Sequence, residues 1–410
     1  MTALARRRRR NTLVALATGL VAAVAAPTLV YVGAKAISNS TAGINALEDK
    51  PLEQLFPQTP TAMLATVSDT NELTSVTVLV LAPDADASDK GYDQRGGSLV
   101  PVPINVDTGF GDQLLSLHDA YALGGENELR VDLESAVSLT IEFSKVMTGE
   151  SFNTFLSGLP PVDVTLPVDV IGVDGATLIP KGTASLSTAQ LTQILTTKSP
   201  AQTERLRHPN LDAVWTAIAA ANGMGRTGQA LSVGAPTTFD QLAARLTAGK
   251  MESRGLVARP LAADLNPQGN DVESLDRPDT ILVFASIAPA AMTRPASGLT
   301  FRVEAPAGYD QQVRKTIGIL LSFGGNVVSV DLNAESREDT KFLIYDKSLA
   351  EVEPKDNPIF GTVTIETPDV QLGSVDETIV LGTKYLDQVD LSAPDASSTS
   401  STVEPTETTA

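Results

Sequence analysis

Residues 75–81 read Ser-Val-Thr-Val-Leu-Val-Leu, and the interpretation of the surrounding sequence starts from this run. Its residues are β-branched or aliphatic at nearly every position, without alternation of polar and apolar side chains. Such a run is typical of a strand that is buried on both faces of a sheet. We therefore expect a central strand here, with helices covering the sheet.

Further strand and helix patterns lie on the C-terminal side of this run. Strands are predicted at residues 98–106 and 162–170, and helices are predicted at residues 126–147, 187–195 and 210–221. Residues 61–250 therefore read as one α/β domain, an α+β mixed sheet covered by helices.

A second, smaller α/β domain is predicted at residues 297–388. Its helix, residues 309–323, has its apolar positions on one face and is terminated by Gly324-Gly325. Its predicted strands are residues 299–304, 326–332, 341–346, 362–366 and 377–381. Residues 251–296 connect the two domains, and within them residues 280–286 are predicted to form a strand. Residues 389–410 contain too few apolar side chains to offset the entropy of ordering and predict a disordered acidic tail.

The N-terminal sequence indicates a membrane anchor. Residues 6–10 are five arginines, and residues 11–34 carry no charged side chain. About 20 apolar residues span a bilayer as a helix, and flanking arginines stay on the cytoplasmic side. A cleaved signal peptide ending at the small residues 23–25 is the alternative.

On the anchor interpretation, the protein lies in the cell membrane as a single-pass protein. Residues 1–11 form a basic cytoplasmic N-terminus, residues 12–34 form the transmembrane helix and residues 35–60 form a linker. The two α/β domains are then extracellular.

Composition excludes several classes of function. The net charge of −19 argues against a nucleic-acid partner, because phosphate backbones are bound by clustered lysine and arginine. The chain has no cysteine and only two histidines, His118 and His208, and it lacks a Gly-x-Ser-x-Gly motif. These absences argue against thiol nucleophiles and serine triads. Gly223, Gly225 and Gly228 follow a predicted helix, so they indicate a loop rather than a dinucleotide site.

Few charged residues are candidates for a ligand site. Arg95, Arg205 and Arg207 are the bases that we expect near an anionic ligand, and Asp84 and Asp107 are the candidate acids. Asp84 belongs to an acidic loop with Asp86, Asp89 and Asp93, which has no EF-hand spacing and favours a solvated loop. Arg205 and Arg207 are two positions apart and do not share one helix face, which favours solvated side chains for both arginines.

Several segments together resemble the LytR-CpsA-Psr family, whose members transfer lipid-linked glycans to the cell wall. Residues 118–125, His-Asp-Ala-Tyr-Ala-Leu-Gly-Gly, are similar to its Asn-Ala-Ala-Tyr-Ala-x-Gly-Gly segment. Residues 152–170 are similar to its helix-loop-strand segment, and Lys181-Gly182 with residues 186–195 to the turn and helix that follow. Residues 377–385, Glu-Thr-Ile-Val-Leu-Gly-Thr-Lys-Tyr, resemble the last strand of the LytR-type C-terminal domain.

The charged positions of the family are altered in this sequence. Ser75-Val76 stands where the family has Asp-Thr, and Pro103-Ile104-Asn105 stands where it has Pro-Arg-Asp. The segment Glu204-Arg205-Leu-Arg-His208 keeps one arginine of Gly-Arg-x-x-Arg-Gln. Asp107, on the same side of a strand as Asn105, is a possible replacement for the lost aspartate.

The resemblance implies partners among polyprenyl-linked glycans or other cell-wall components. The leading hypothesis is a non-catalytic binding or scaffolding protein without a cofactor, with an apolar cleft for the polyprenyl chain. The first alternative is an active phosphotransferase that acts on polyprenyl-pyrophosphate-linked glycans and uses Mg²⁺. The second is a purely structural envelope protein.

Overall fold

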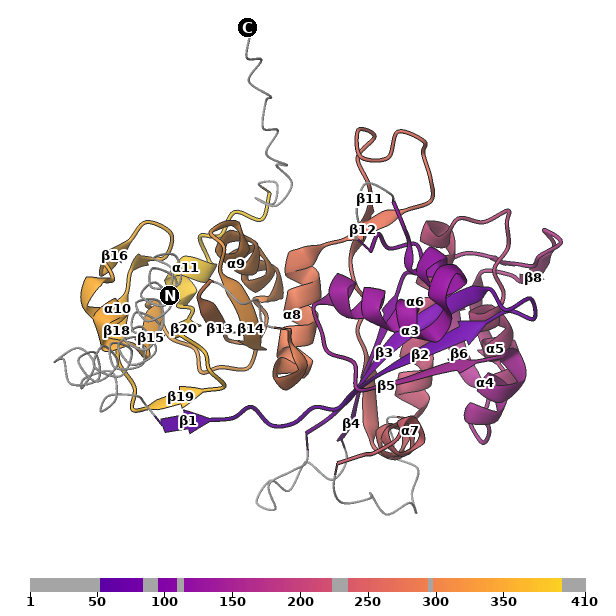
Figure 1. The fold of residues 1–410 in the computed structure, drawn as a ribbon, viewed down its shortest axis with the longest axis horizontal. Helices are drawn as coiled ribbons and strands as arrows, with labels where there is room; N and C mark the ends of the chain where they lie inside the picture. The colour runs from indigo at the N-terminus through magenta and orange to yellow at the C-terminus, as the bar shows by residue number, and fades with distance from the viewer. Residues whose placement is uncertain (1–51, 84–94, 109–113, 223–234, 294–297, 393–410) are drawn as a thin grey trace, which may run out of the picture. The chain divides into compact units, whose positions relative to one another are not determined.

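The computed structural model describes residues 52–83, 95–108, 114–222, 235–293 and 298–392 (Figure 1). The predicted transmembrane helix and most of the predicted C-terminal tail lie outside these ranges, so they stay predictions. Within the described ranges, no helix combines the length and the apolar character needed to cross a bilayer.

The first sheet is mixed, and the run that opened the sequence analysis forms its middle strand. The strand order is β10 (Lys250–Ser253), β4 (Arg95–Val102), β3 (Leu73–Leu81), β2 (Thr61–Val67) and β5 (Phe143–Met147). The inner strands β2, β3 and β4 are antiparallel, whereas β5 and β10 add parallel strands at the edges. Every residue of β3 is buried, which confirms the predicted central strand.

Helices cover both faces of this sheet, which explains why β3 shows no polar alternation. Met63 and Val78 pack on one side with α3 (Leu117–Val137), while Leu64 and Leu79 pack on the other side. That second side is covered by α4 (Gly149–Phe155), α5 (Thr188–Thr196), α6 (Glu204–Asn222) and α7 (Phe239–Ala248). The α/β class with a mixed sheet between helices is therefore confirmed.

Two hairpins precede α5. The outer strands β6 (Val162–Leu166) and β9 (Gly182–Leu186) pair antiparallel, and so do the inner strands β7 (Val170–Ile171) and β8 (Thr177–Ile179). The predicted strand at residues 162–170 is therefore two strands. Ser187 caps α5 in a capping box with Gln190, which agrees with the predicted start of that helix.

The predicted helix at residues 126–147 was wrong at both ends. The helix α3 starts at Leu117 instead of residue 126, and Ser116 caps it through a capping box with Asp119. Gly125, with φ of 66°, kinks the helix, and Ser138 ends it in the left-handed conformation. The end of the predicted range, residues 143–147, forms the edge strand β5. Similarly, α6 starts at Glu204 rather than at residue 210.

The C-terminal unit is a second mixed sheet. Its strand order is β14 (Asn326–Asp331), β13 (Thr300–Glu304), β20 (Glu377–Val380), β15 (Lys341–Ile344) and β18 (Thr364–Glu366). The helix α9 (Asp310–Ser322) joins β13 to β14, as the sequence predicted. The shorter elements are η2 (Pro289–Ala291), α10 (Lys347–Val352), α11 (Thr383–Leu386), β1 (Leu52–Gln54), β11 (Ala258–Pro260), β12 (Glu273–Leu275), β16 (Asp356–Asn357), β17 (Gly361–Thr362) and β19 (Val370–Leu372).

Residues 280–286 form a helix, so the predicted strand there was wrong. The helix α8 (Arg277–Ile287) is capped by Asp276, whose side chain accepts a hydrogen bond from the Asp279 backbone N–H, and Pro278 lies in its first turn. Residues 280–285 are all buried, so the helix has no polar face. A helix that is buried on all sides shows no 3.6-residue alternation of polar and apolar residues. Its sequence therefore resembles that of a buried strand.

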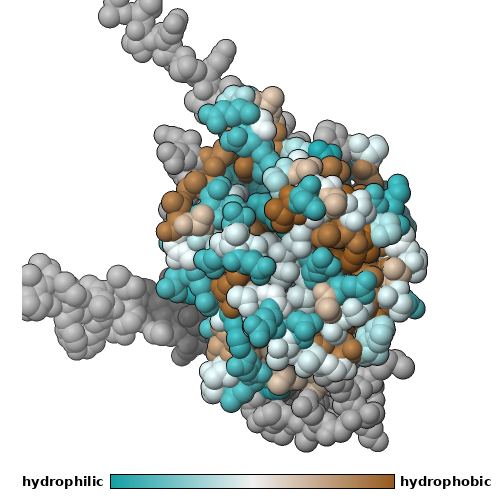
Figure 2. All heavy atoms as spheres, turned by 90° about the vertical axis from the view of Figure 1, so that its right-hand side faces the viewer, coloured by the Kyte–Doolittle hydropathy of each residue, from teal (hydrophilic) through white to brown (hydrophobic). Residues whose placement is uncertain are grey.

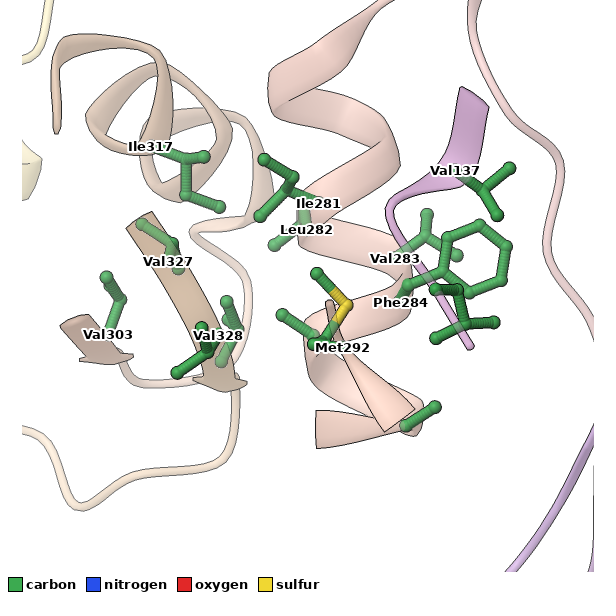
Figure 3. Close-up of a cluster of buried hydrophobic side chains, with 14 of the residues drawn as sticks. Val137, Ile281, Leu282, Val283, Phe284, Met292, Val303, Ile317, Val327 and Val328 are labelled. Atoms are coloured by element: carbon green, nitrogen blue, oxygen red, sulfur yellow. The ribbon is translucent and has the colours of Figure 1, made fainter. Parts of the chain in front are cut away.

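The helix α8 packs between two groups of apolar side chains. Figure 3 shows Ile281 and Leu282 toward Ile317 and the β14 valines, and it shows Phe284 beside Val137 at the end of α3. An ion pair between Arg314 of α9 and Asp276 adds a polar contact on the C-terminal side. The core of the C-terminal unit therefore continues into α8.

A fragment that begins at Asp276 should be more stable than one that begins at Gly298. The longer fragment keeps Ile281 and Leu282 against α9 and β14, and burial of two such side chains contributes about 3 kcal/mol or more to the free energy of unfolding. Urea unfolding of the two fragments, each ending at Ser392, measures the difference.

The matched controls are Ile281→Ala and Val283→Ala in the longer fragment. The first should cost at least 2 kcal/mol, whereas the second should cost less, because Val283 faces the missing α3 (Figure 3). Equal stability of the two fragments would contradict the role that we assign to α8.

Candidate functional site

A polar hollow of about 860 Å³ opens at one end of the first domain. Its wall is built from the β2–β3 turn, the start of α3, the tip of the β7–β8 hairpin, α5 and the connection between α5 and α6. The charged or titratable groups on this wall are Asp69, Glu72, His118 and Lys198. On the side where Figure 1 places β8, α4 and α5, the surface in Figure 2 is a mosaic of hydrophilic and hydrophobic residues.

Lys198 is the cation of this hollow. It makes no ion pair or hydrogen bond with any described residue, although it is half-buried. Burial lowers the pKa of its ammonium group, and the nearby Arg207 lowers it further, against the opposing carboxylates of Glu204, Glu72 and Asp271. A partly desolvated cation without a direct partner is a candidate binding group for an anion.

His118 lies close enough to Lys198 for the two to interact. Burial and the charge of Lys198 lower the pKa of the His118 imidazole below its usual value of 6.5. The imidazole is therefore neutral at pH 7 and has both a hydrogen-bond donor and an acceptor. The hollow thus presents one cation, one neutral imidazole and two carboxylates.

Arg207 is buried and serves the protein itself. Its Nε donates to the Thr197 carbonyl at 2.9 Å, and its two terminal nitrogens donate to Glu204 Oε2 at 2.8 Å and to the Thr74 carbonyl at 2.5 Å. The side chain is 4% exposed. Each nitrogen of the guanidinium group therefore has a partner inside the protein, and Arg207 holds α5, α6 and β3 together.

The other predicted site residues are spread over the domain. Arg205 is exposed near the buried Glu273, and the backbone N–H of Asp107 donates to the Glu273 carbonyl. Arg95 starts β4, at the opposite end of that strand from the segment that leads to Asp107. Asp84, the rest of its acidic loop and Gly223, Gly225 and Gly228 lie outside the described residues. The structure therefore brings Arg205 and Asp107 to Glu273, and it separates Arg95 from them.

Ser75, Ile104 and Asn105, which stand where the family motifs have charged residues, are buried in this structure. Ile104 is 1% exposed and belongs to the hydrophobic core. The Ser75 hydroxyl bonds to the Thr66 hydroxyl at 2.6 Å, and Asn105 Nδ2 donates to Asp271 Oδ1 at 3.2 Å. None of the three side chains lines the hollow.

Asp271 and Glu273 were missed by the sequence reasoning. The segment that contains them runs beside residues 105–107: the Glu273 N–H donates to the Asn105 carbonyl, and Asp271 Oδ2 accepts from the Glu204 N–H. Nothing in the local sequence pattern predicts this pairing over more than 160 residues. Lys198 was also missed, although it is the only basic residue between Lys181 and Arg205.

The first turns of α6 carry a buried row of charges. Burial alone would raise the pKa of Glu204, but Arg207 and His208 outweigh it and lower this pKa to about 2. Burial alone would lower the pKa of His208, but Asp212 and Glu204 outweigh it and raise this pKa to about 9. His208 is therefore a buried imidazolium between two carboxylates at neutral pH.

Two further hollows lie away from this site. An apolar cavity of about 30 Å³ between the sheet and helices α4, α6 and α7 is lined by Leu79, Trp215 and Phe155, among others. An open groove of about 480 Å³ lies outside it, and Phe155 lines both. This cavity has room for one or two water molecules and is too small for the polyprenyl chain of the predicted apolar cleft. Among the described residues, no group of three His, Asp or Glu side chains is placed to hold a metal ion.

The charge row of α6 should make stability depend on pH at both ends of the scale. The folded-state pKa of Glu204 is depressed, so its contribution is complete above about pH 4.5 and is lost as the pH falls toward 2. The folded-state pKa of His208 is raised, so its contribution is complete below about pH 6.5 and is lost as the pH rises through 9. Urea unfolding measured between pH 6 and 9.5 should show the alkaline loss.

His208→Gln should flatten this alkaline slope, and His118→Gln is the control. The folded-state pKa of His118 is lowered rather than raised, so removing it should not reduce the loss above pH 6.5. Identical slopes for His208→Gln and the unmodified protein would contradict the buried imidazolium.

Introducing the residues of the family motifs at positions 104 and 105 should destabilise this protein. Ile104→Arg would bury a guanidinium in the apolar core, and Asn105→Asp would bring a carboxylate within hydrogen-bond distance of Asp271. An uncompensated buried charge costs about 3–5 kcal/mol, whereas the control Ile104→Leu should cost less than about 1.5 kcal/mol. Urea unfolding of each single variant measures these changes, and a stability equal to that of the unmodified protein would contradict the prediction.

No protein-family model and no curated protein sequence matches this chain. Several solved structures match this chain, with TM-scores below 0.5. Bacillus subtilis TagT is 14% identical, with 58% of this chain and 94% of that chain covered and a TM-score of 0.38. The LytR-CPS2A-psr family protein YwtF (TagT), with bound octaprenyl pyrophosphate lipid, is 16% identical, with 57% and 93% covered and a TM-score of 0.37.

Bacillus subtilis TagV is 12% identical to this chain, with 65% of this chain and 98% of that chain covered and a TM-score of 0.38. The structural neighbours of this chain therefore include LytR-CpsA-Psr family proteins, at low identity.

Proposed function

We propose that this chain is a cell-envelope protein that binds the phosphate-bearing head group of a polyprenyl-linked glycan and does not transfer the glycan. The observation that carries the proposal is Lys198, a half-buried ammonium group with no direct partner, on the wall of a hollow of about 860 Å³. A hollow of this size fits a head group larger than phosphate alone. The motif resemblance, from the His118 segment to the last strand, supports the choice of ligand.

The proposed head-group contacts come from few side chains. Lys198 supplies the charge-assisted hydrogen bond to a phosphate oxygen, and the neutral His118 supplies one further hydrogen bond. On the same wall, Thr197 contributes a hydroxyl group for the sugar, and Thr196 Oγ1, which donates to the Thr192 carbonyl at 2.9 Å, can still accept a hydrogen bond. The negative charge of Glu72 and Asp69 favours a ligand that carries few phosphates.

The buried state of the altered positions supports binding without transfer. Phosphoryl transfer depends on cations aimed at the charge that develops in the transition state, and loss of one such donor costs about 3–4 kcal/mol of transition-state stabilisation. Ile104 and Asn105 supply no such charge, and Arg207 is engaged with carbonyl groups and Glu204. Lys198 is then the main cation at the hollow.

The alternative is an active phosphotransferase, and one observation favours it. Glu72 and Asp69 line the same hollow as Lys198. Mg²⁺ is commonly held by one or two carboxylates together with phosphate oxygens of the substrate. Under this alternative, the two carboxylates would hold the metal and Lys198 would hold the phosphate. On the binding proposal no cofactor is needed.

The location of the protein is part of the proposal. The arginine run at residues 6–10 and the uncharged residues 11–34 support a single-pass membrane protein with its folded domains outside the cell. The division into an LCP-like domain at residues 61–250 and a LytR-type C-terminal domain at residues 297–388 is proposed on the same sequence evidence.

Lys198→Ala should weaken binding of farnesyl pyrophosphate to the purified full chain by about tenfold or more. A hydrogen bond to a charged group contributes about 1.5–3 kcal/mol, and 1.4 kcal/mol corresponds to a factor of ten in affinity. Titration calorimetry without added metal measures the change. Lys181→Ala is the matched control, because Lys181 is an exposed lysine in the neighbouring hairpin and does not line the hollow.

Two outcomes would count against the proposal in different ways. Equal affinities of Lys198→Ala and the unmodified protein would show that the hollow is not the head-group site. Turnover of the pyrophosphate by the unmodified protein on addition of Mg²⁺, lost in Glu72→Gln, would favour the transferase.

A further inference from the structure

A short segment before the first sheet pairs with the C-terminal unit. The strand β1 does not pair with the first sheet. Its partner is β19, which is more than 300 residues away in the sequence. The Gly373 N–H donates to the Gln54 carbonyl at 2.7 Å, and the Ser374 hydroxyl donates to Glu53 Oε1 at 2.6 Å. The first sheet then begins at Thr61.

Phe56 closes this contact with its ring. The side chain is 6% exposed and belongs to the hydrophobic core, whereas Leu55 beside it is 70% exposed. A Cβ atom on Gly373 would lie 2.1 Å from the Phe56 ring, so only glycine leaves room for it. Gly373 also has φ of +55°, which disfavours other residues for a second reason.

We propose that residues 53–56 form a strap that fastens the segment before β2 to the C-terminal unit. Its parts are the main-chain bond to Gln54, the side-chain bond to Glu53 and the Phe56 ring on Gly373. Four residues, two of them proline, separate Phe56 from β2, so the strap leaves the connection little slack. Residues 53–56 are thus held at the C-terminal unit, and none of them lines the Lys198 hollow.

The strap is separable from both cores. Phe56 is its one buried large side chain, and all three residues of β1 are exposed. A contact of this size opens locally without global unfolding. Because no residue of the strap lines the hollow, its release should leave the ligand affinity unchanged.

Limited chymotrypsin digestion of Gly373→Ala tests the strap in the full chain. The added methyl group should expel the Phe56 ring and speed cleavage after Leu55 by about tenfold or more, since cleavage follows the population of the open state. Gly361→Ala is the matched control. Gly361 also has a positive φ, of +72°, but a Cβ there meets no atom within 4 Å. The control therefore carries the backbone strain without the displaced ring, and its cleavage rate should match that of the unmodified protein.

A disulfide across the strap provides a test that does not rely on loss of structure. Glu53→Cys with Ser374→Cys places the only two thiols of an otherwise cysteine-free chain at hydrogen-bonded positions. Oxidation should give an intramolecular disulfide and protect the site from chymotrypsin, also when Gly373→Ala is present, and reduction should reverse the protection.

Failure of the thiols to pair within one chain, or equal cleavage of Gly373→Ala and Gly361→Ala, would overturn the strap. Farnesyl pyrophosphate affinity of the oxidised and reduced protein should be the same. A change in that affinity would contradict the separation of strap and hollow, while leaving the test of Lys198 itself unaffected.

Discussion

Neutralising the buried guanidinium of Arg207 is the constraint on which the candidate site depends. A desolvated cation is stable only when partners satisfy it, and here these are Glu204 and the carbonyl groups of Thr74 and Thr197. Through these contacts the start of α6, the end of α5 and the strand β3 are fixed together. The connection between α5 and α6 then carries Lys198 to the wall of the hollow. Lys198, which we propose binds the ligand, is thus positioned by Arg207, which makes its contacts inside the protein.

The altered motif positions form a network of their own. Asn105 donates to Asp271, Asp271 accepts from the start of α6, and Ile104 fills the apolar core. An aspartate at position 105 would face Asp271, and an arginine at position 104 would have to leave the core. The residues around these positions therefore fit the neutral side chains that the chain has. Asn105, Asp271 and the start of α6 therefore form one hydrogen-bonded structural unit.

Local sequence predicted the parts of the fold that carry a local signal. The run of residues 75–81 predicted the central strand, Ser187 marked the start of α5 and the one-sided apolar pattern of residues 309–323 predicted α9. The helix α8 escaped because burial on all sides removed its period, although Asp276 and Pro278 are a start signal for a helix. The site was predicted less well, because the lack of a partner for Lys198 and the burial of Arg207 are set by distant segments.

The chain combines two kinds of attachment between its α/β parts. The helix α8 shares an apolar core with both α3 and α9, so separating it would expose several large side chains. The segment at residues 53–56 adds a smaller contact, which consists of the Phe56 ring and two hydrogen bonds. Because local opening follows the smallest contact, the second attachment should open first while the first stays closed. The geometry therefore allows residues 53–56 to detach while the core around α8, and with it the Lys198 hollow, keeps its structure.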